Sequence, residues 1–177
     1  MIKALRHFLT ITRHRHKVIS HCFKAGIFWQ GLFHDISKYT PSEFITGAKY
    51  YQGGKRSPNE AERVKFGYSK AWLHHKGRNR HHFEYWTDIN PATHQLTPVK
   101  MPLKYVTEMF CDRVAASKIY KGSEYNDGCP LLYFKNEKGA RFINQETSDT
   151  LERWLTVLAN EGEKAVFALI RKERKQG

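Results

Sequence analysis

Apolar residues recur at intervals of three and four between Ile2 and about Lys24, which is the spacing of a helix with one buried face. The positions that carry this pattern are Leu5, Phe8, Leu9, Ile11, Val18, Ile19, Cys22 and Phe23. Gly26 follows the pattern and is expected to end the helix. A second helix is predicted from Ile27 to Ile36, with His34 and Asp35 near its C-terminal end.

In residues 40–75, residue patterns typical of helix starts and of loops predict where the elements begin and end. Thr40-Pro41-Ser42-Glu43 combines an N-cap hydroxyl, a first-turn proline and a glutamate three residues after the cap, which predicts a helix to about Tyr51. Residues 53–58, Gly-Gly-Lys-Arg-Ser-Pro, are typical of a loop. Asn59 is expected to cap a helix that runs through His75. Its predicted buried face consists of Val64, Tyr68, Ala71 and Trp72.

The remaining pattern is also helical, with two irregular stretches. After an aromatic segment at 81–86 the chain is predicted to form a loop at 90–102, then a helix from Pro102 to about Lys121. Residues 125–144 are expected to be irregular, with a turn at 136–139. Two closing helices are predicted, at about Ser148–Asn160 and Glu163–Lys175. We therefore expect one all-α domain over 1–177, in which the helices of 147–177 pack on the core.

The composition of the chain indicates which class of binding partner to expect. The chain has 177 residues, of which 40% are hydrophobic, and this is enough for one core. The formal net charge of +13 favours a phosphorylated small molecule, a nucleotide or a nucleic acid as partner, because clustered cations attract polyanions. A basic surface that only confers solubility is the alternative.

The spacing of the cysteines and the length of the apolar runs indicate the cellular compartment that we expect for this protein. Cys22, Cys111 and Cys129 are widely spaced and form no Cys-x-x-Cys motif, so we expect neither a disulfide framework nor a zinc ribbon. No apolar run approaches membrane-spanning length. Arg6 and Arg15 interrupt the N-terminal apolar pattern, which a signal peptide would not tolerate. A cytoplasmic protein without membrane contact is expected.

Histidine and aspartate residues cluster in a way that indicates metal chemistry. His34-Asp35 is followed by His74-His75, by His81-His82 and then by Asp112, and four of the ten histidines fall within nine consecutive positions. Imidazoles and carboxylates on helices are the ligands from which metal sites for phosphate chemistry are assembled. Asp112 lies in a predicted apolar helix, where a charge is costly to bury unless it is paired or coordinated.

These residues form a pattern of His, then His-Asp, then a distant Asp, which resembles the HD superfamily of metal-dependent phosphohydrolases. More specifically, the chain resembles a small uncharacterised family of bacterial and phage proteins within that superfamily, over most of its length. The motifs are His14-Arg-x-x-Val18-x-x-x-Cys22, Gly31-Leu-x-His34-Asp35-x-Ser37-Lys38, Pro41-Ser-Glu43-Phe44, Asn79-x-His81-His82-x-Glu84-Tyr85-Trp86, Met101-Pro102 and Glu108-Met-x-Cys-Asp112-x-x-Ala115-Ala116-Ser117.

The resemblance implies a set of metal ligands. His14, His34, Asp35 and Asp112 would hold one metal, and Asp35 would bridge to a second metal held by His75 and His82, with His74 and His81 as the next candidates. His21 lies on the same helix face as His14, so periodicity alone does not separate them. The superfamily's His-x-x-x-Val turn matches His14 and Val18, which favours His14. A core or capping role for one histidine of each pair is the alternative.

The catalytic and substrate-binding candidates are Asp35, Lys38 and Glu108. Lys38 stands one turn after the dipeptide, as in the cyclic-dinucleotide phosphodiesterase branch of the superfamily, where the corresponding lysine faces substrate phosphate. That branch's Gly-Tyr-Pro element is absent here. Glu108 is interpreted as a partner of a ligand, a general base or a further ligand, or else as a solvated residue. Further candidates for phosphate contacts, or for a solvated face, are Lys76, Arg78, Arg80 and Lys118.

The expected function is hydrolysis of a phosphoester, such as a nucleotide, at one or two transition metals. Iron and manganese suit the site as well as zinc does, because it lacks thiolates. Two alternatives remain: a di-iron oxygenase of the same fold, and a non-catalytic module that binds nucleotides or nucleic acid.

Overall fold

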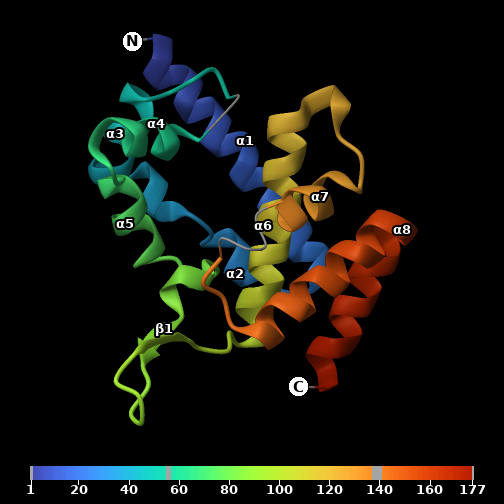
Figure 1. Ribbon diagram of the computed structural model, residues 1–177. Coiled ribbons are helices and arrows are strands. Elements are labelled where there is room, and N and C mark those ends of the chain that lie inside the picture. Colours follow the sequence, from blue (N-terminus) through green and yellow to red (C-terminus); the bar gives the residue numbers. More distant parts are fainter. Residues whose placement is uncertain (1, 55–56, 137–140, 177) are drawn as a thin grey trace.

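Helices make up nearly all the regular structure of the computed structural model, which describes residues 2–54, 57–136 and 141–176 (Figure 1). The α-helices are α1 (Ile2–Ala25), α2 (Phe28–Leu32), α3 (Pro41–Lys49), α4 (Pro58–Phe66), α5 (Lys70–Lys76), α6 (Leu103–Lys121), α7 (Cys129–Asn136) and α8 (Gln145–Gln176). The 3-10 helices are η1 (Ile36–Tyr39), η2 (Phe83–Tyr85) and η3 (Gly122–Glu124). An antiparallel hairpin joins β1 (Thr87–Ile89) to β2 (Leu96–Pro98), with Asp88 opposite Thr97. The predicted all-α class is confirmed.

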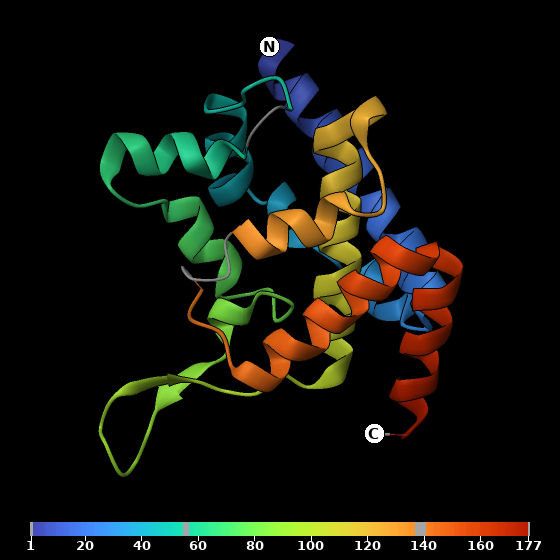
Figure 2. The same cartoon turned by 45° about the vertical axis from the view of Figure 1, so that its right-hand side comes forward.

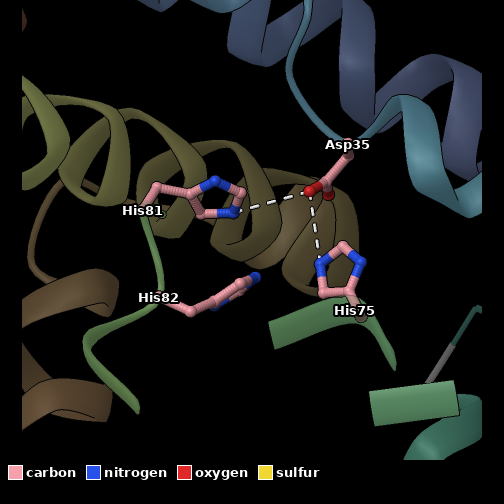
Figure 3. A group of neighbouring side chains, drawn as sticks. All are labelled: Asp35, His75, His81 and His82. Carbon is pink, nitrogen blue, oxygen red and sulfur yellow. Dashed lines mark ion pairs between the residues drawn. The ribbon is translucent and has the colours of Figure 1, made fainter. Parts of the chain in front are cut away.

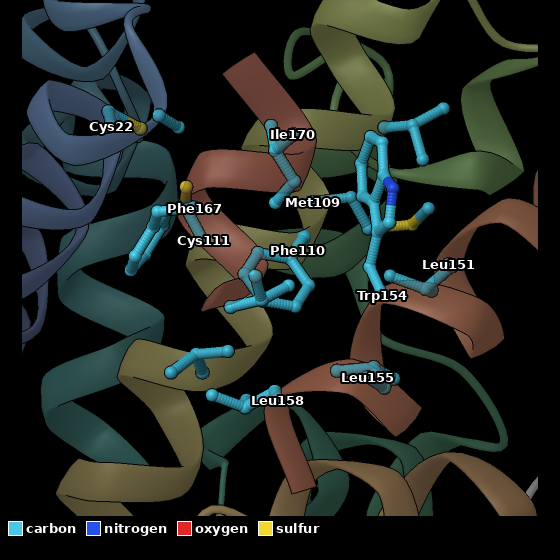
Figure 4. Packing of buried hydrophobic residues seen from close by; sticks show 14 of the residues in the cluster. Cys22, Met109, Phe110, Cys111, Leu151, Trp154, Leu155, Leu158, Phe167 and Ile170 are labelled. Atoms are coloured by element: carbon cyan, nitrogen blue, oxygen red, sulfur yellow. The ribbon is translucent and has the colours of Figure 1, made fainter. Parts of the chain in front are cut away.

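Helix α6 lies at the centre of the fold. It contacts α1 along one side and α7 and α8 along others, so it is apolar around most of its circumference. Phe110, which is labelled in Figure 4, and Val114 are fully buried and belong to one continuous core. Asp112 and Glu108 also lie on this helix, and each therefore sits among buried neighbours.

Helix α8 consists of two arms that meet at Gly162, whose backbone is not helical (φ 81°, ψ 178°). Glu173 on the second arm accepts hydrogen bonds at 3.0 Å from Arg153 Nη2 and Trp154 Nε1 on the first, so the arms lie side by side (Figure 2). The two arms correspond to the two closing helices predicted from the sequence. Both pack on the core, through Leu151, Trp154, Leu155, Leu158, Val166, Phe167 and Ile170.

The second predicted helix is shorter than expected, and this correction concerns the site directly. Helix α2 ends at Leu32, so His34 and Asp35 lie in a turn between α2 and η1. Asp35 has a left-handed backbone (φ 53°), which interrupts a right-handed helix and which aspartate tolerates better than most residues. The dipeptide is thus held in a turn rather than on a helix face.

The single helix expected from Asn59 to His75 is two helices. Gly67, with φ 78°, ends α4, and Ser69 caps α5 by accepting a hydrogen bond from the Trp72 backbone. Ser57, not Asn59, caps α4. Because the break reorients the chain, Val64 and Tyr68 are 86% and 48% exposed, contrary to the prediction, whereas Ala71 and His75 are buried.

Other differences are local. The hairpin occupies much of the predicted 90–102 loop, and α7 lies in the stretch 125–144 that was expected to be irregular. Helix α3 ends at Lys49, two residues early, and the Thr40 hydroxyl donates to the Ser37 carbonyl instead of capping that helix. Residues 55–56 of the predicted loop and 137–139 of the predicted turn lie outside the described residues. No helix in the described ranges combines the length and apolarity needed to cross a membrane.

Gly31 allows α2 to pack directly against α1, and a mutation there tests how this packing places the dipeptide. A Cβ at position 31 would overlap the side chain of Cys22, which is fully buried. Gly31→Ala should therefore displace α2 and lower the free energy of unfolding by about 1–3 kcal/mol. Urea denaturation measures this. Trp29→Ala, on the exposed side of the same helix, is the control, and equal stability of the two variants would contradict the packing argument.

Candidate metal centre

The turn that carries His34 and Asp35 is held by α1. Arg15 donates from Nε to the His34 carbonyl at 3.2 Å and from Nη2 to the Leu32 carbonyl. These bonds satisfy carbonyls that the short helix α2 leaves free. The Asp35 carboxylate faces the interior and is 2% exposed. Sequence reasoning missed the role of Arg15, although the residue stands next to His14 in the motif that defined the resemblance.

One group of ligand atoms comes from α1, the turn and α6. His14 Nε2 lies 2.9 Å from Asp112 Oδ1, and His34 Nε2 lies 3.2 Å from Asp35 Oδ2. His34 Nε2 is also 3.6 Å from Asp112 Oδ1. One atom from each of the four residues lies within 4.8 Å of the others. We call His14, His34, Asp35 and Asp112 group one.

A second group shares Asp35 and adds three histidines from α5 and the segment that follows it. Asp35 Oδ1 lies 3.2 Å from His75 Nε2 and 3.5 Å from His81 Nε2, and His82 completes a set whose atoms all lie within 4.8 Å (Figure 3). We call Asp35, His75, His81 and His82 group two. His81, only a secondary candidate in the sequence, occupies a position equivalent to that of His75.

The atoms that face the centre of the two groups lack hydrogen bonds. They are His14 Nε2, His34 Nε2, both Asp35 carboxylate oxygens, His75 Nε2, His81 Nε2 and His82 Nε2. Each is buried, and within the described residues none has an aligned donor or acceptor. A buried polar atom without a partner is costly, whereas coordination of a cation would satisfy several such atoms at once. The residues therefore fit one or two metal ions.

Buried carboxylates fix the outer nitrogen of three of these imidazoles. Glu108 Oε1 lies 2.8 Å from His34 Nδ1 and 3.1 Å from His81 Nδ1, and Gln30 donates to its other oxygen at 2.5 Å. Glu43 Oε2 lies 2.8 Å from His75 Nδ1. With the proton on Nδ1, each ring presents a lone pair on Nε2, which is the state that binds metals.

The contacts of Glu43 and Glu108 differ from those that their predicted roles require. Glu43 was interpreted as part of a capping box, yet its carboxylate contacts His74 and His75. Glu108 was a candidate general base, yet its oxygens are engaged behind the imidazoles of His34 and His81, away from the inward nitrogens. The geometry therefore gives both glutamates a positioning role.

The protonation states also suit a cation site. Burial raises the pKa of Asp35, but the positive charges of His34, Lys38 and His75 outweigh it and hold that pKa well below the ordinary value. Burial lowers the pKa of His14, although the nearby Asp112 carboxylate opposes this shift, and burial lowers that of His82 well below the usual range. These two rings are neutral at neutral pH and available as ligands.

His34 carries the proton that balances the buried carboxylates when no cation is bound. Burial opposes its charge, yet Asp35, Asp112 and Glu108 raise its pKa well above the ordinary value. Burial likewise opposes protonation of His75, whose pKa is raised by Asp35 and Glu43. A metal ion would replace these protons, so its binding should release them.

Lys38 reaches the same centre from the solvent side. Its Nζ lies 2.5 Å from Asp35 Oδ2, and its side chain is 32% exposed. It lines a hollow of about 210 Å³ that also contains His14, His75 and Asp112. Lys38 is thus the cation best placed to meet an anion that enters at group one or two.

Several predicted residues lie elsewhere. His21 Nδ1 faces the Cys111 carbonyl at 3.3 Å, and its Nε2 lies 3.7 Å from Glu163, outside both groups. His74 contacts Glu43 and Ser42 rather than Asp35. Lys118 pairs with Glu163. The other three phosphate candidates, Lys76, Arg78 and Arg80, do not line the hollows described beside the two groups, so they are not placed to contact a phosphate there.

The positions of His14 and His21 predict different results for the two alanine variants. His14→Ala should remove a ligand and lower the metal content of the purified protein. His21→Ala should leave the metal content unchanged, because His21 belongs to a separate polar cluster with Lys118 and Glu163. Elemental analysis of both variants decides between them, and loss of metal only in His21→Ala would refute the assignment.

Replacing Glu108 and replacing Glu43 are expected to affect the affinities for the two metals differently. Glu108 holds one histidine of each group, so Glu108→Ala should lower the affinity for both metals by about 10- to 100-fold, whereas Glu43→Ala should weaken only the metal at group two. Competition with a coloured chelator resolves the two affinities. Glu108→Gln, which keeps an acceptor, should retain more affinity than Glu108→Ala. Unchanged affinities in both alanine variants would exclude the positioning roles.

Comparison with known proteins identifies a family for this chain but assigns no activity to it. No curated protein and no solved structure matches the chain significantly. One family of unknown function, DUF5662, matches residues 3–157, a range that contains every residue of group one and group two. On this match, the chain belongs to the family of unknown function DUF5662.

Proposed function

We propose that this chain is a metal-dependent phosphohydrolase of the HD type that acts on a nucleotide or another phosphoester. The observation that carries the proposal is the pair of ligand groups joined by Asp35, with seven inward atoms that have no hydrogen bond in the part of the chain that the structure describes. A carboxylate shared by two sets of imidazoles is a suitable bridge between two cations. The His34-Asp35 pair, His14 and Asp112 occur in the order of the HD pattern.

The donor set supports a transition metal without selecting one. Groups one and two together offer five imidazoles and two carboxylates and contain no thiolate. Such sites accept iron, manganese or zinc. Bound metals would supply Lewis acidity toward a phosphoryl oxygen and lower the pKa of water between them.

The chain's own residues would bind and orient the substrate. Lys38 is anchored by Asp35 and reaches into the hollow beside the ligands, where its ammonium can contact a phosphoryl oxygen. The net charge of +13 favours approach of an anion. Burial of Asp35 and His34 keeps bulk water from competing for the centre.

A pair of variants tests the proposal. Asp35→Ala should lose both metal and phosphate release, because this carboxylate belongs to both groups. Lys38→Ala should keep its metal yet lower kcat/KM by about one to three orders of magnitude, as expected for loss of one aligned electrostatic contact. The measurements are elemental analysis and a phosphate-release screen across mononucleotides, cyclic nucleotides and oligonucleotides.

Three outcomes would contradict the proposal. Less than about a tenth of an equivalent of transition metal, in protein made under metal-replete conditions, would remove the site itself. Oxygen consumption by the iron-loaded protein without phosphate release would point to an oxygenase. Full metal occupancy with salt-sensitive binding to oligonucleotides, but no turnover, would indicate a binding module.

A further inference from the structure

Helix α1 presents a line of apolar side chains to solvent, on the side opposite its buried face. His14 and Val18 belong to the buried face, which packs into the bundle. The opposite side carries Leu5, Leu9 and Phe23, and their intervals of four and fourteen residues place them on one line along a helix. Leu5 is 60% exposed and Phe23 is 70% exposed. The bundle therefore covers only part of the apolar surface of α1.

Aromatic rings extend this line onto α2. Phe23 contacts Phe28 edge-on, with ring centres 6.0 Å apart, and Phe28 contacts Trp29 in the same way at 5.5 Å. Trp29 is 72% exposed. An exposed apolar surface that runs over several large side chains marks a site of interaction with a protein or a membrane. We call Leu5, Leu9, Phe23, Phe28 and Trp29 the outer apolar face.

Positive charge flanks the outer apolar face. The first 34 residues of the chain contain six lysines and arginines and no aspartate or glutamate. Arg6, Arg13 and Lys17 are exposed, and their spacings of seven and four residues place them on a second line along α1, beside the apolar one. We call these three residues the basic line. Such a segment attracts anionic surfaces, because no acidic side chain in it offsets the positive potential.

The combination of apolar and basic residues discriminates between the partners that could cover this face. Pairing with a second copy of the chain would bring two basic lines together, and like charges repel. A nucleic acid would match the positive charge but offers no apolar interior to cover Leu5 and Leu9. A membrane with anionic lipids supplies both an apolar interior and negative phosphates. Helices with Leu, Phe or Trp on one side and Lys and Arg beside them are typical of membrane surfaces.

We infer that the outer apolar face docks on the surface of a membrane that contains anionic lipids, with α1 parallel to that surface. Leu5 and Phe23 enter the boundary between headgroups and acyl chains, Trp29 lies at the level of the headgroups, and the basic line contacts lipid phosphates. This differs from the sequence expectation of no membrane contact, because a helix that lies on the surface needs no membrane-spanning length. The inference is independent of the proposed function, since none of these residues belongs to group one or group two.

Sedimentation with lipid vesicles tests the inference on the full chain. Vesicles of phosphatidylcholine alone are compared with vesicles that also contain about 30% phosphatidylglycerol, which is anionic. We expect the affinity for the anionic vesicles to be at least about tenfold higher, because each basic residue near the surface adds to the attraction. Raising the salt concentration from about 0.1 M to about 0.5 M should weaken this binding, because salt screens the charges.

Matched variants separate the outer apolar face from the rest of the surface. Leu5→Glu should lower the affinity for anionic vesicles by about tenfold or more, because a charge replaces a side chain that enters the membrane. Leu132, which is 62% exposed on α7, provides the control, and Leu132→Glu should keep the affinity within about twofold. Lys17→Gln should lower the affinity about fivefold, whereas Lys70→Gln, at an exposed position on α5, should leave it unchanged.

Trp29 reports insertion directly. Vesicles with brominated acyl chains should quench the fluorescence of the wild-type protein, whereas Trp29→Phe should bind without this quenching, since its indole is gone and Trp154 is fully buried. All the substituted side chains are exposed, so the variants should fold normally, and circular dichroism checks this.

Four results would overturn the inference. They are equal binding to neutral and anionic vesicles, equal effects of Leu5→Glu and Leu132→Glu, quenching that survives in Trp29→Phe, and a dimer in solution that Leu5→Glu dissociates. In the last case a second copy of the chain, and not a membrane, would cover the outer apolar face.

Discussion

The placement of the buried Asp35 and the largely buried Asp112 beside five imidazoles is the constraint on which the rest of this structure depends. Two carboxylates at the centre of an apolar bundle are costly unless positive charge compensates them. Without a metal, the protons on His34 and His75 and the ammonium of Lys38 supply that charge. A cation with open coordination positions would supply it better and would also satisfy the inward nitrogens that have no hydrogen-bond partner among the described residues.

Three features of the fold hold these groups in place. Helix α6 brings Asp112 and Glu108 to the centre because it is surrounded by α1, α7 and α8. Arg15 on α1 ties down the turn in which Asp35 adopts its left-handed backbone. Glu43 on α3 fixes the ring of His75. The site is therefore assembled from elements far apart in sequence, and its rigidity comes from the buried contacts behind the ligands.

The same arrangement leaves one side of the centre open. Lys38 lines the smaller hollow. A larger hollow of about 650 Å³, also bordered by Asp112 and His82, is lined by Arg113, the residue after Asp112 on α6. Lys38 and Arg113 thus place positive charge beside the candidate ligands, whereas Lys118 is paired with Glu163 at another place in the fold.

The sequence by itself determined the all-α class, the long helices α1 and α6, the two arms of α8 and most of the candidate ligands, because helical periodicity and rare clusters of His and Asp are local signals. It did not determine the turn at Asp35, the break at Gly67 or the helix α7, since short elements depend on tertiary contacts as much as on propensity. Nor could it rank His81 beside His75 or show that Glu43 and Glu108 lie behind the imidazoles. Those assignments depend on which side chains the packing of α1, α3 and α6 brings within hydrogen-bonding distance, and no spacing along one chain records that distance.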